Sequence, residues 1–146
     1  MPASLLAKLQ AARRFDQAWE TVQYVGPALI DMALHSLPNG TPVDIAEFEA
    51  VQNRLLGVPP DIGQRHHLSH FQHLFSGASY AAGYYVYMWA EVLEAGDPFD
   101  PTTAERLLRH VYSAGNRCEP AAAFRAFRGR DPQVAPMLRK RGLLPA

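Results

Sequence analysis

Histidines and tyrosines are concentrated between His66 and Trp89, in the stretch HHLSHFQHLFSGASYAAGYYVYMW. This stretch holds four of the six histidines and four of the six tyrosines of the chain. Imidazole and phenol groups both donate and accept hydrogen bonds. The glycines among them let a backbone approach a ligand closely or move. The composition therefore predicts part of a site that binds a polar backbone or stabilises a developing oxyanion.

The spacing of the tyrosines suggests how such a site would be built. Tyr80 and Tyr87 are seven residues apart, so on a helix they would share one face with Tyr84, while Tyr85 would point elsewhere. A phenol that donates to an oxyanion in a dry site can contribute ~3 kcal/mol. The alternative is an aromatic helix packed in a core, with its hydroxyl groups bonded to backbone.

Three histidines raise the question of a metal. His66, His70 and His73 have the spacing i, i+4, i+7, and imidazoles bind zinc, nickel and copper. No carboxylate lies among them, and Pro59, Pro60 and Gly63 oppose a continuous helix. We therefore predict no native metal site, with a stand-alone site on these histidines as the alternative.

Length and composition favour a single domain over residues 1–146, because 48% of the residues are apolar and a core can form. No run of 18 apolar residues occurs, so we expect no membrane partner. The single cysteine, Cys118, excludes an internal disulfide and fits a cytoplasmic location.

The charges balance overall but not along the chain. Residues 104–146 carry nine Lys and Arg against three Asp and Glu, a local net charge of +6. Such a region could bind nucleic acid. We favour instead that it faces the acidic half or another part of a longer protein, and predict no nucleic-acid partner.

Apolar residues recur with helical spacing, which predicts an all-α fold. Proline after a polar residue marks several helix starts. The predicted helices run from Ser4 to Leu34 with a kink or break at Gly26-Pro27, from Thr41-Pro42 to Gly57, from Tyr80 to Glu94, from Asp100-Pro101 to Gly115-Asn116, from Glu119-Pro120 through Phe127, and from Asp131-Pro132 to Gly142. Residues 58–79 should be irregular at first.

The chain also resembles a known family over nearly its whole length. The order His73, Gly77, Tyr80, Gly83, Tyr84-Tyr85, Tyr87 and Trp89 resembles the region downstream of the metal site in the thimet oligopeptidase family, which includes oligopeptidase A and bacterial peptidyl-dipeptidases. Arg13–His35 resembles an FNQ-type helix of that family, and Ser113–Leu143 its closing segment. Compared with that pattern, about two helical turns are missing after Trp89.

The resemblance implies the C-terminal, helical segment of a zincin-like catalytic domain. Enzymes of that family hold zinc with H-E-x-x-H and use its glutamate as general base. No H-E-x-x-H occurs in these 146 residues. We therefore expect a chain that lacks the zinc-binding half, holds no cofactor of its own, and is inactive or nearly so by itself.

The same resemblance implies roles for individual residues. Tyr80 would donate to the scissile carbonyl oxygen, and His73 and Tyr87 would position the peptide backbone. The remaining substrate-binding candidates are Tyr84 on the same face and the hinge glycines Gly77 and Gly83. The expected partners are short peptides and either the missing zinc-binding half or a second copy of the chain. The alternative function is a peptide-binding or interaction module without enzymatic activity.

Overall fold

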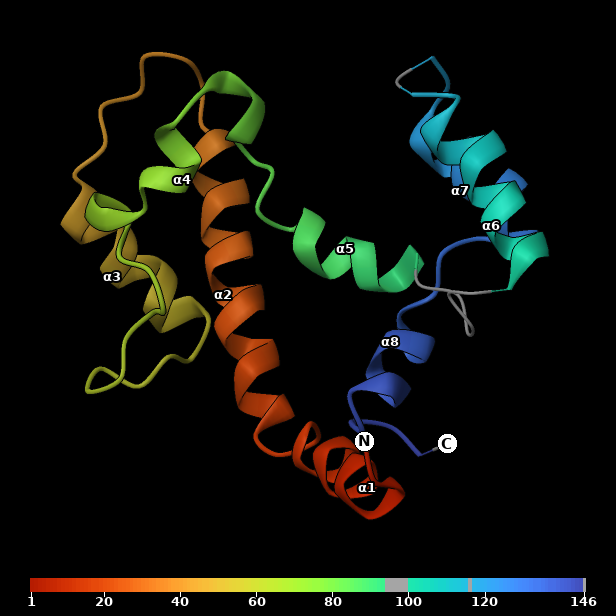
Figure 1. Ribbon diagram of the computed structural model, residues 1–146. Helices are drawn as coiled ribbons and strands as arrows, with labels where there is room; N and C mark the ends of the chain where they lie inside the picture. Colours follow the sequence, from red (N-terminus) through yellow and green to blue (C-terminus); the bar gives the residue numbers. More distant parts are fainter. Residues whose placement is uncertain (94–99, 116, 146) are drawn as a thin grey trace. The chain divides into compact units, whose positions relative to one another are not determined.

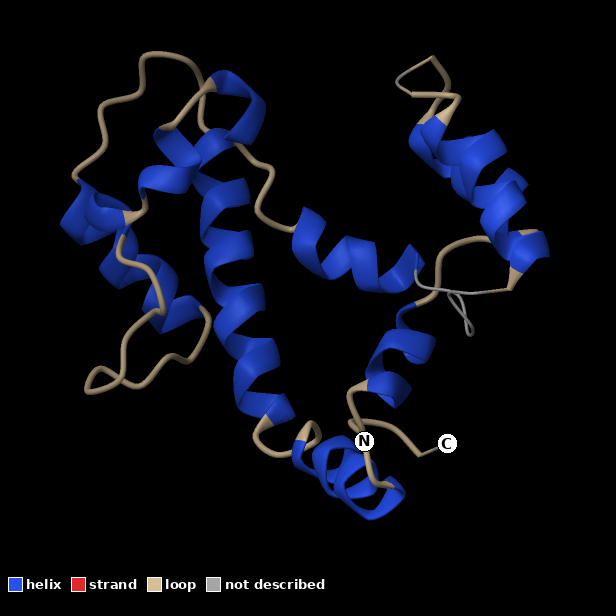
Figure 2. Ribbon diagram, viewed as in Figure 1, coloured by secondary structure: helices blue, strands red, loops and turns tan. Residues whose placement is uncertain are grey.

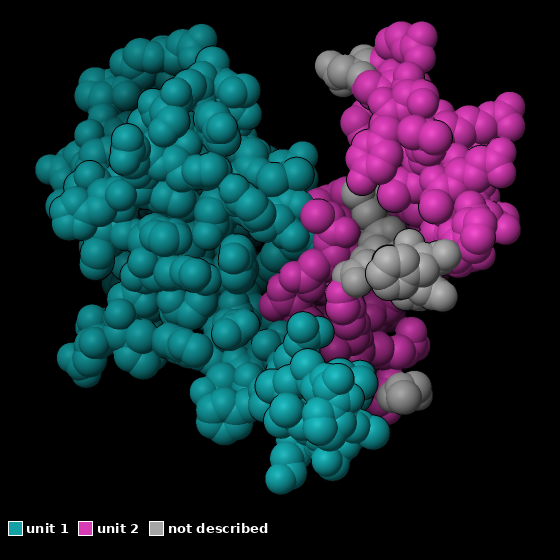
Figure 3. Space-filling view, in the orientation of Figure 1, with its two compact units in different colours: residues 1–88 teal, residues 89–146 magenta. Residues whose placement is uncertain are grey.

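The computed structural model describes residues 1–93, 100–115 and 117–145, and these residues form helices, turns and loops without a strand (Figure 2). The predicted all-α fold is thereby confirmed. Two compact units divide the chain, residues 1–88 and residues 89–146 (Figure 3). A single domain over residues 1–146 stays a prediction.

The described residues form eight α-helices and three short helices of other types (Figure 1). In chain order they are α1 (Ala3–Ala12), α2 (Gln17–His35), α3 (Ile45–Leu55), the 3-10 helix η1 (Leu68–His70), α4 (Gln72–Phe75), the 3-10 helix η2 (Ala78–Tyr80), α5 (Val86–Leu93), α6 (Pro101–Leu107), the π-helix η3 (Leu108–Tyr112), α7 (Pro120–Arg128) and α8 (Val134–Lys140). None of these helices is both long and apolar enough to cross a bilayer.

Helix α2 is the centre of the first unit. Its buried face packs against the segment that follows α3, and the shared core consists of Ala28, Ile30, Leu68, Phe71, Leu74 and Tyr84. Gly26 allows the closest approach, because a Cβ there would lie 2.5 Å from the side-chain Oε1 of Gln64. The core thus joins α2 to the histidine-rich segment of the sequence.

The first predicted helix, from Ser4 to Leu34, differs from the structure at its start and along its length. The helix does not begin at Ser4, because α1 already begins at Ala3 after Pro2. The helix is interrupted between α1 and α2, where Asp16 has a left-handed φ of 55°. At Gly26-Pro27, by contrast, α2 continues as one helix. Of the predicted kink or break, the break was therefore wrong, and the kink stays a prediction.

The start of α3 was predicted three residues too early in the cap motif. Asp44, not Thr41, caps the helix, and its carboxylate accepts the Glu47 N–H at 2.9 Å. The Thr41 hydroxyl instead donates to the carbonyl of Pro38 at 2.7 Å. The predicted end is confirmed, because Gly57 follows the last turn with a φ of +67°.

In the second unit, two helix starts that were predicted from a polar residue followed by proline are confirmed. Asp100 accepts the Thr103 N–H and Glu119 accepts the Ala122 N–H, each at 2.9 Å, which satisfies a free donor of the first helical turn. The predicted ends at Glu94 to Pro98 and at Asn116 involve residues outside those the structure describes.

The last helix begins later than predicted. Asp131 pairs with Arg125 at 3.0 Å, so its carboxylate does not cap a helix, and α8 begins at Val134. Its predicted end is confirmed, because Gly142 has a φ of +75° directly after the C-cap.

The second unit is held by a small aromatic core and one ion pair. Phe124, Phe127 and Met137 are buried, and the Trp89 ring meets Phe124 edge-on at 5.7 Å between centroids. Arg141 donates two hydrogen bonds to the Glu91 carboxylate, from Nε to Oε2 at 2.8 Å and from a terminal nitrogen to Oε1. These bonds lower the pKa of Glu91 below its usual value.

We predict that Glu91→Gln destabilises the second unit by about 1–2 kcal/mol, because a bidentate, charge-assisted contact is lost. Since the folded-state pKa of Glu91 is depressed, its contribution is complete above the unfolded pKa and is lost as the pH falls through the folded value. Denaturant unfolding at pH 7 and pH 3 would measure both effects. Asp131→Asn, which removes an exposed pair, is the control and should change stability by less than about 0.5 kcal/mol.

Candidate functional site

The tyrosine segment does not form the single helix that its spacing predicted. Tyr80 ends the 3-10 helix η2, residues 81–85 form turns, and α5 begins only at Val86. No α-helix runs from Tyr80 into α5, because Ala82 has a left-handed φ of 54° and the Gly83 N–H closes a turn on the Tyr80 carbonyl at 3.1 Å. The prediction that Tyr80, Tyr84 and Tyr87 share one face of a helix was therefore wrong.

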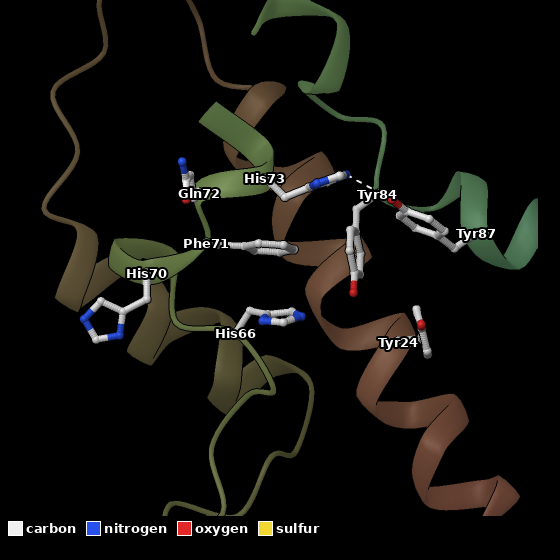
Figure 4. Close-up of a pocket in the computed structure, with 8 residues that line it drawn as sticks. All are labelled: Tyr24, His66, His70, Phe71, Gln72, His73, Tyr84 and Tyr87. Atoms are coloured by element: carbon white, nitrogen blue, oxygen red, sulfur yellow. Dashed lines mark hydrogen bonds between the residues drawn. The ribbon is translucent and has the colours of Figure 1, made fainter. Parts of the chain in front are cut away.

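The tertiary structure nevertheless brings the three tyrosines to one histidine. The rings of Tyr80, Tyr84 and Tyr87 lie 4.7, 6.4 and 6.0 Å from the His73 ring, measured between centroids. The Tyr87 hydroxyl and His73 Nε2 form a hydrogen bond of 3.1 Å, drawn as a dashed line in Figure 4. Among the described residues, Tyr85 makes no ring contact with this histidine and is exposed.

A cleft of about 430 Å³ opens beside this cluster (Figure 4). Its walls come from α2, from the segment around η1 and α4, and from the turn before α5, and its lining residues are Tyr24, His66, His70, Phe71, Gln72, His73, Tyr84 and Tyr87. Tyr80 stands next to His73 and is 44% exposed, and Tyr87 is 46% exposed. Polar ring groups therefore border an accessible cavity whose volume lies within the usual range of ligand-binding pockets.

Tyr84 forms the inner wall of this cleft. Its side chain is only 7% exposed, and its ring contacts Phe71 at 4.9 Å and Tyr87 at 5.4 Å between centroids. Burial, followed by the proximity of Tyr24, raises the pKa of the Tyr84 phenol. Tyr84 is thus a core residue that also lines the cleft, and its role in substrate binding stays a prediction.

His66 lies on the opposite wall, stacked on Phe71 with 4.5 Å between ring centroids. Its pKa is lowered from the usual value, first by burial and then by the charge of Arg65 and the nearby His73. A neutral imidazole at this position offers both a donor and an acceptor to a ligand in the cleft.

The three histidines considered as metal ligands do not form a ligand set. His66 precedes η1, His70 ends η1, and His73 belongs to α4, so no continuous helix aligns them. Figure 4 shows the His70 ring turned away from the other two, and His73 Nε2 is bonded to Tyr87. No group of three or more His, Cys, Asp or Glu side chains suited to a metal ion occurs in the described part of the chain.

The two glycines singled out in the sequence have different surroundings. A Cβ on Gly83 would lie 3.1 Å from the Tyr80 carbonyl oxygen, so a side chain there would require this turn to shift by a few tenths of an ångström. A Cβ on Gly77 would have no atom closer than 4.0 Å, and the backbone there is extended. A hinge at these glycines stays a prediction.

Sequence reasoning missed Asp31, although the structure places its carboxylate directly under the tyrosine turn. Asp31 is completely buried, and its two oxygens accept the N–H groups of Ala82 at 3.0 Å and Tyr84 at 2.9 Å. His35 Nδ1 lies 2.8 Å from the same carboxylate. The available signal was a carboxylate inside the apolar run ALIDMAL, where a buried charge requires partners.

Comparison with known proteins identifies the family to which this chain belongs. Residues 1–143 match peptidase family M3. The chain is 35% identical to the dipeptidyl carboxypeptidase of Escherichia coli strain K12 and 33% identical to oligopeptidase A of the same strain, in each case over 98% of this chain and 22% of the relative. It is also 33% identical to a probable cytosolic oligopeptidase A of Arabidopsis thaliana, over 100% of this chain and 22% of that protein.

The chain therefore belongs to peptidase family M3, as the resemblance in its sequence indicated. It spans about a fifth of the length of the curated relatives that it matches. The match to the dipeptidyl carboxypeptidase extends over 158 residues, more than the 146 of this chain, so that relative has residues without a counterpart here. The two helical turns that are predicted to be missing after Trp89 would be lost partly around residues 94–99, which lie outside the described ranges.

We predict that the imidazole of His66 titrates below pH 6.5, the ordinary value for histidine. Because the folded-state pKa is depressed, protonation of His66 opposes folding, so its effect on stability appears as the pH falls below the unfolded pKa. Arg65→Gln should raise the His66 pKa, since one of the charges that lowers it is removed.

Histidine-detected NMR titration would measure both quantities. Arg54→Gln, at an exposed arginine of α3, is the matched control and should leave the His66 titration unchanged. A His66 midpoint above pH 6.5 would contradict the burial of this ring.

Proposed function

We propose that this chain forms the substrate- and transition-state-binding part of a zinc-dependent oligopeptidase or peptidyl-dipeptidase, an enzyme that hydrolyses peptide bonds of short peptides. The observation that carries the proposal is the cluster of Tyr80, Tyr84 and Tyr87 around His73 at the edge of an open cleft. Membership of family M3, with relatives named dipeptidyl carboxypeptidase and oligopeptidase A, supports it.

The chemistry of the cluster is suited to holding a peptide backbone. A phenol can donate one hydrogen bond to a carbonyl oxygen, and the donation strengthens as that oxygen becomes an oxyanion. In our proposal Tyr80 makes this donation. Tyr87 and His73, already bonded to each other at 3.1 Å, orient the neighbouring peptide groups, and Tyr84 fixes the wall behind them.

Family M3 uses zinc, but the donor set of this chain does not fit that ion, because the described residues offer no cluster of ligands and the sequence contains no H-E-x-x-H. In our proposal the ion, the attacking water and the general base are held by residues outside these 146. The isolated chain should then lack peptidase activity, since hydrogen-bond donors cannot complete hydrolysis without a nucleophile and a base.

The partner that this proposal requires is the zinc-binding part of the enzyme. Apolar side chains on α2, among them Trp19, Val22 and Leu29, are exposed and are suited to such a contact. A second copy of the chain is the other partner that we consider, and sedimentation of the isolated chain would detect it.

A second candidate function is a peptide-binding module without catalysis. It is favoured by one observation: the cleft and its polar rings are present, whereas metal ligands are not found among the described residues. Saturable binding of short peptides without turnover, even in the presence of the zinc-binding part of a relative, would support this function over the enzymatic one.

The experiment combines this chain with a fragment of Escherichia coli oligopeptidase A that carries the zinc-binding half. In the reconstituted enzyme, Tyr80→Phe should lower kcat and kcat/KM together by about 100-fold, because the lost hydrogen bond acts mainly in the transition state. Steady-state kinetics on short peptides would measure this effect, with zinc content as a check.

Tyr85→Phe is the matched control for this experiment, because Tyr85 is 47% exposed and makes none of the His73 ring contacts among the described residues. It should change kcat/KM by less than about twofold. Equal, small effects of both substitutions would mean that Tyr80 is a packing residue, and its assignment as oxyanion donor would be withdrawn.

Metal analysis gives an independent prediction. The isolated chain, dialysed free of adventitious metal, should hold no stoichiometric zinc because its histidines do not converge. Elemental analysis would measure the content, and chelator treatment should leave the circular dichroism spectrum unchanged. One tightly held zinc ion per chain would overturn this prediction and return attention to His66, His70 and His73.

A further inference from the structure

The strongest unassigned feature of the first unit is a buried carboxylate under the segment that carries the tyrosines. Asp31 lies in the C-terminal half of α2, one turn before its end at His35, and is fully buried. A carboxylate that loses its water is strongly destabilised unless hydrogen bonds replace that water. The partners of Asp31 therefore indicate what its burial stabilises.

Two of those partners belong to one turn. Oδ1 accepts the Ala82 N–H and Oδ2 accepts the Tyr84 N–H, so the two oxygens hold the residues on either side of Gly83. The bonded atoms are 51 and 53 residues away in sequence. Such charge-assisted bonds are stronger than neutral ones, and they fix this turn directly onto α2.

The fixed turn has a conformation that local sequence does not favour. Ala82 has a φ of 54°, in the left-handed region where a residue with a side chain is strained. Gly83 lies against the Tyr80 carbonyl, with 3.1 Å between that oxygen and an added Cβ. In this geometry both N–H groups donate to the carboxylate oxygens, and these two bonds offset the strain.

The three site tyrosines lie close to these two contacts in sequence. Tyr80 is two residues before Ala82, Tyr84 carries the second bonded N–H, and Tyr87 is three residues further on. Once the turn is held, the Tyr84 ring packs on Phe71 and the Tyr87 hydroxyl reaches His73. His35, 2.8 Å from the carboxylate on the next helical turn, completes its surroundings.

We propose that Asp31 is a positioning residue, whose carboxylate anchors the 82–84 turn to α2 and thereby presents Tyr80 and Tyr87 to the substrate backbone. It does not touch the peptide and acts through the tyrosines. The kinetic part of this inference rests on the proposed function, whereas the anchoring itself is a property of the chain that can be measured without any activity.

The first arm of the test uses the isolated chain. Asp31→Asn keeps the shape of the side chain but replaces one acceptor oxygen by a donor, so one N–H of the turn loses its partner. Hydrogen exchange followed by NMR should show the Ala82 and Tyr84 amides exchanging at least about tenfold faster, with protection in α3 retained. Unchanged exchange at both amides would overturn the proposal.

The control for that arm is Asp44→Asn. Asp44 also accepts a backbone N–H, from Glu47 at the start of α3, and asparagine is as good a helix cap. Exchange at Ala82 and Tyr84 should not change in this variant. Equal acceleration there would show that the effect reports general destabilisation and would overturn the anchoring role.

The second arm is a double-mutant cycle in the reconstituted enzyme. Asp31→Asn should lower kcat/KM by about 100-fold, since small displacements of a positioning group have effects of this size. Adding Tyr80→Phe should then cost less than about tenfold, because the hydroxyl is already misplaced. Full additivity of the two losses would overturn action through Tyr80.

A milder variant guards against misfolding. Gly83→Ala keeps the carboxylate but pushes on the Tyr80 carbonyl. This variant should accelerate hydrogen exchange at the Ala82 and Tyr84 amides, and it provides the test if the Asp31→Asn variant does not fold. Unchanged exchange at both amides would count against the anchoring role of Asp31. If the unsubstituted reconstituted enzyme shows no turnover, the proposed function fails, while the exchange results still decide the role of Asp31.

Discussion

The first unit depends on the pair of hydrogen bonds between the buried Asp31 carboxylate and the N–H groups of Ala82 and Tyr84. A buried charge is tolerated only where its acceptor sites are filled, so the carboxylate dictates the path of the backbone that approaches it. That path includes a left-handed alanine and a close contact at Gly83. Both the late start of α5 and the arrangement of the site follow from it.

The site shares residues with the core, which links binding to stability. Tyr84 contributes a ring to the buried cluster with Phe71 and Leu74, and the same ring forms a wall of the cleft. The functional face is therefore rigid where Tyr84 is packed and accessible where Tyr80 and Tyr87 are exposed. This division suits the peptide-binding role that we propose, in which a peptide is held in one orientation and the donors stay free to reach it.

The helix boundaries show which local signals are reliable. Asp100 and Glu119 cap helices as their sequence context predicts, because each carboxylate lies next to the free N–H groups of a first turn and accepts one. Thr41 and Asp131 do not, because the first bonds to the carbonyl of Pro38 and the second to Arg125. A cap motif identifies a side chain that can accept a hydrogen bond, but the competing partner is known only once the chain is folded.

The sequence by itself determined the helical class, the helix ends at Gly57 and Gly142, and the family, because periodicity, glycine conformation and the order of the histidine-tyrosine motif are local properties of the chain. It also identified His73, Tyr80, Tyr84 and Tyr87 as a group. Only the tertiary structure decided how they meet, since Tyr80 and Tyr87 lie on different elements and converge through long-range bonds to Asp31. Those bonds join residues more than 50 positions apart, a distance over which local spacing carries no information.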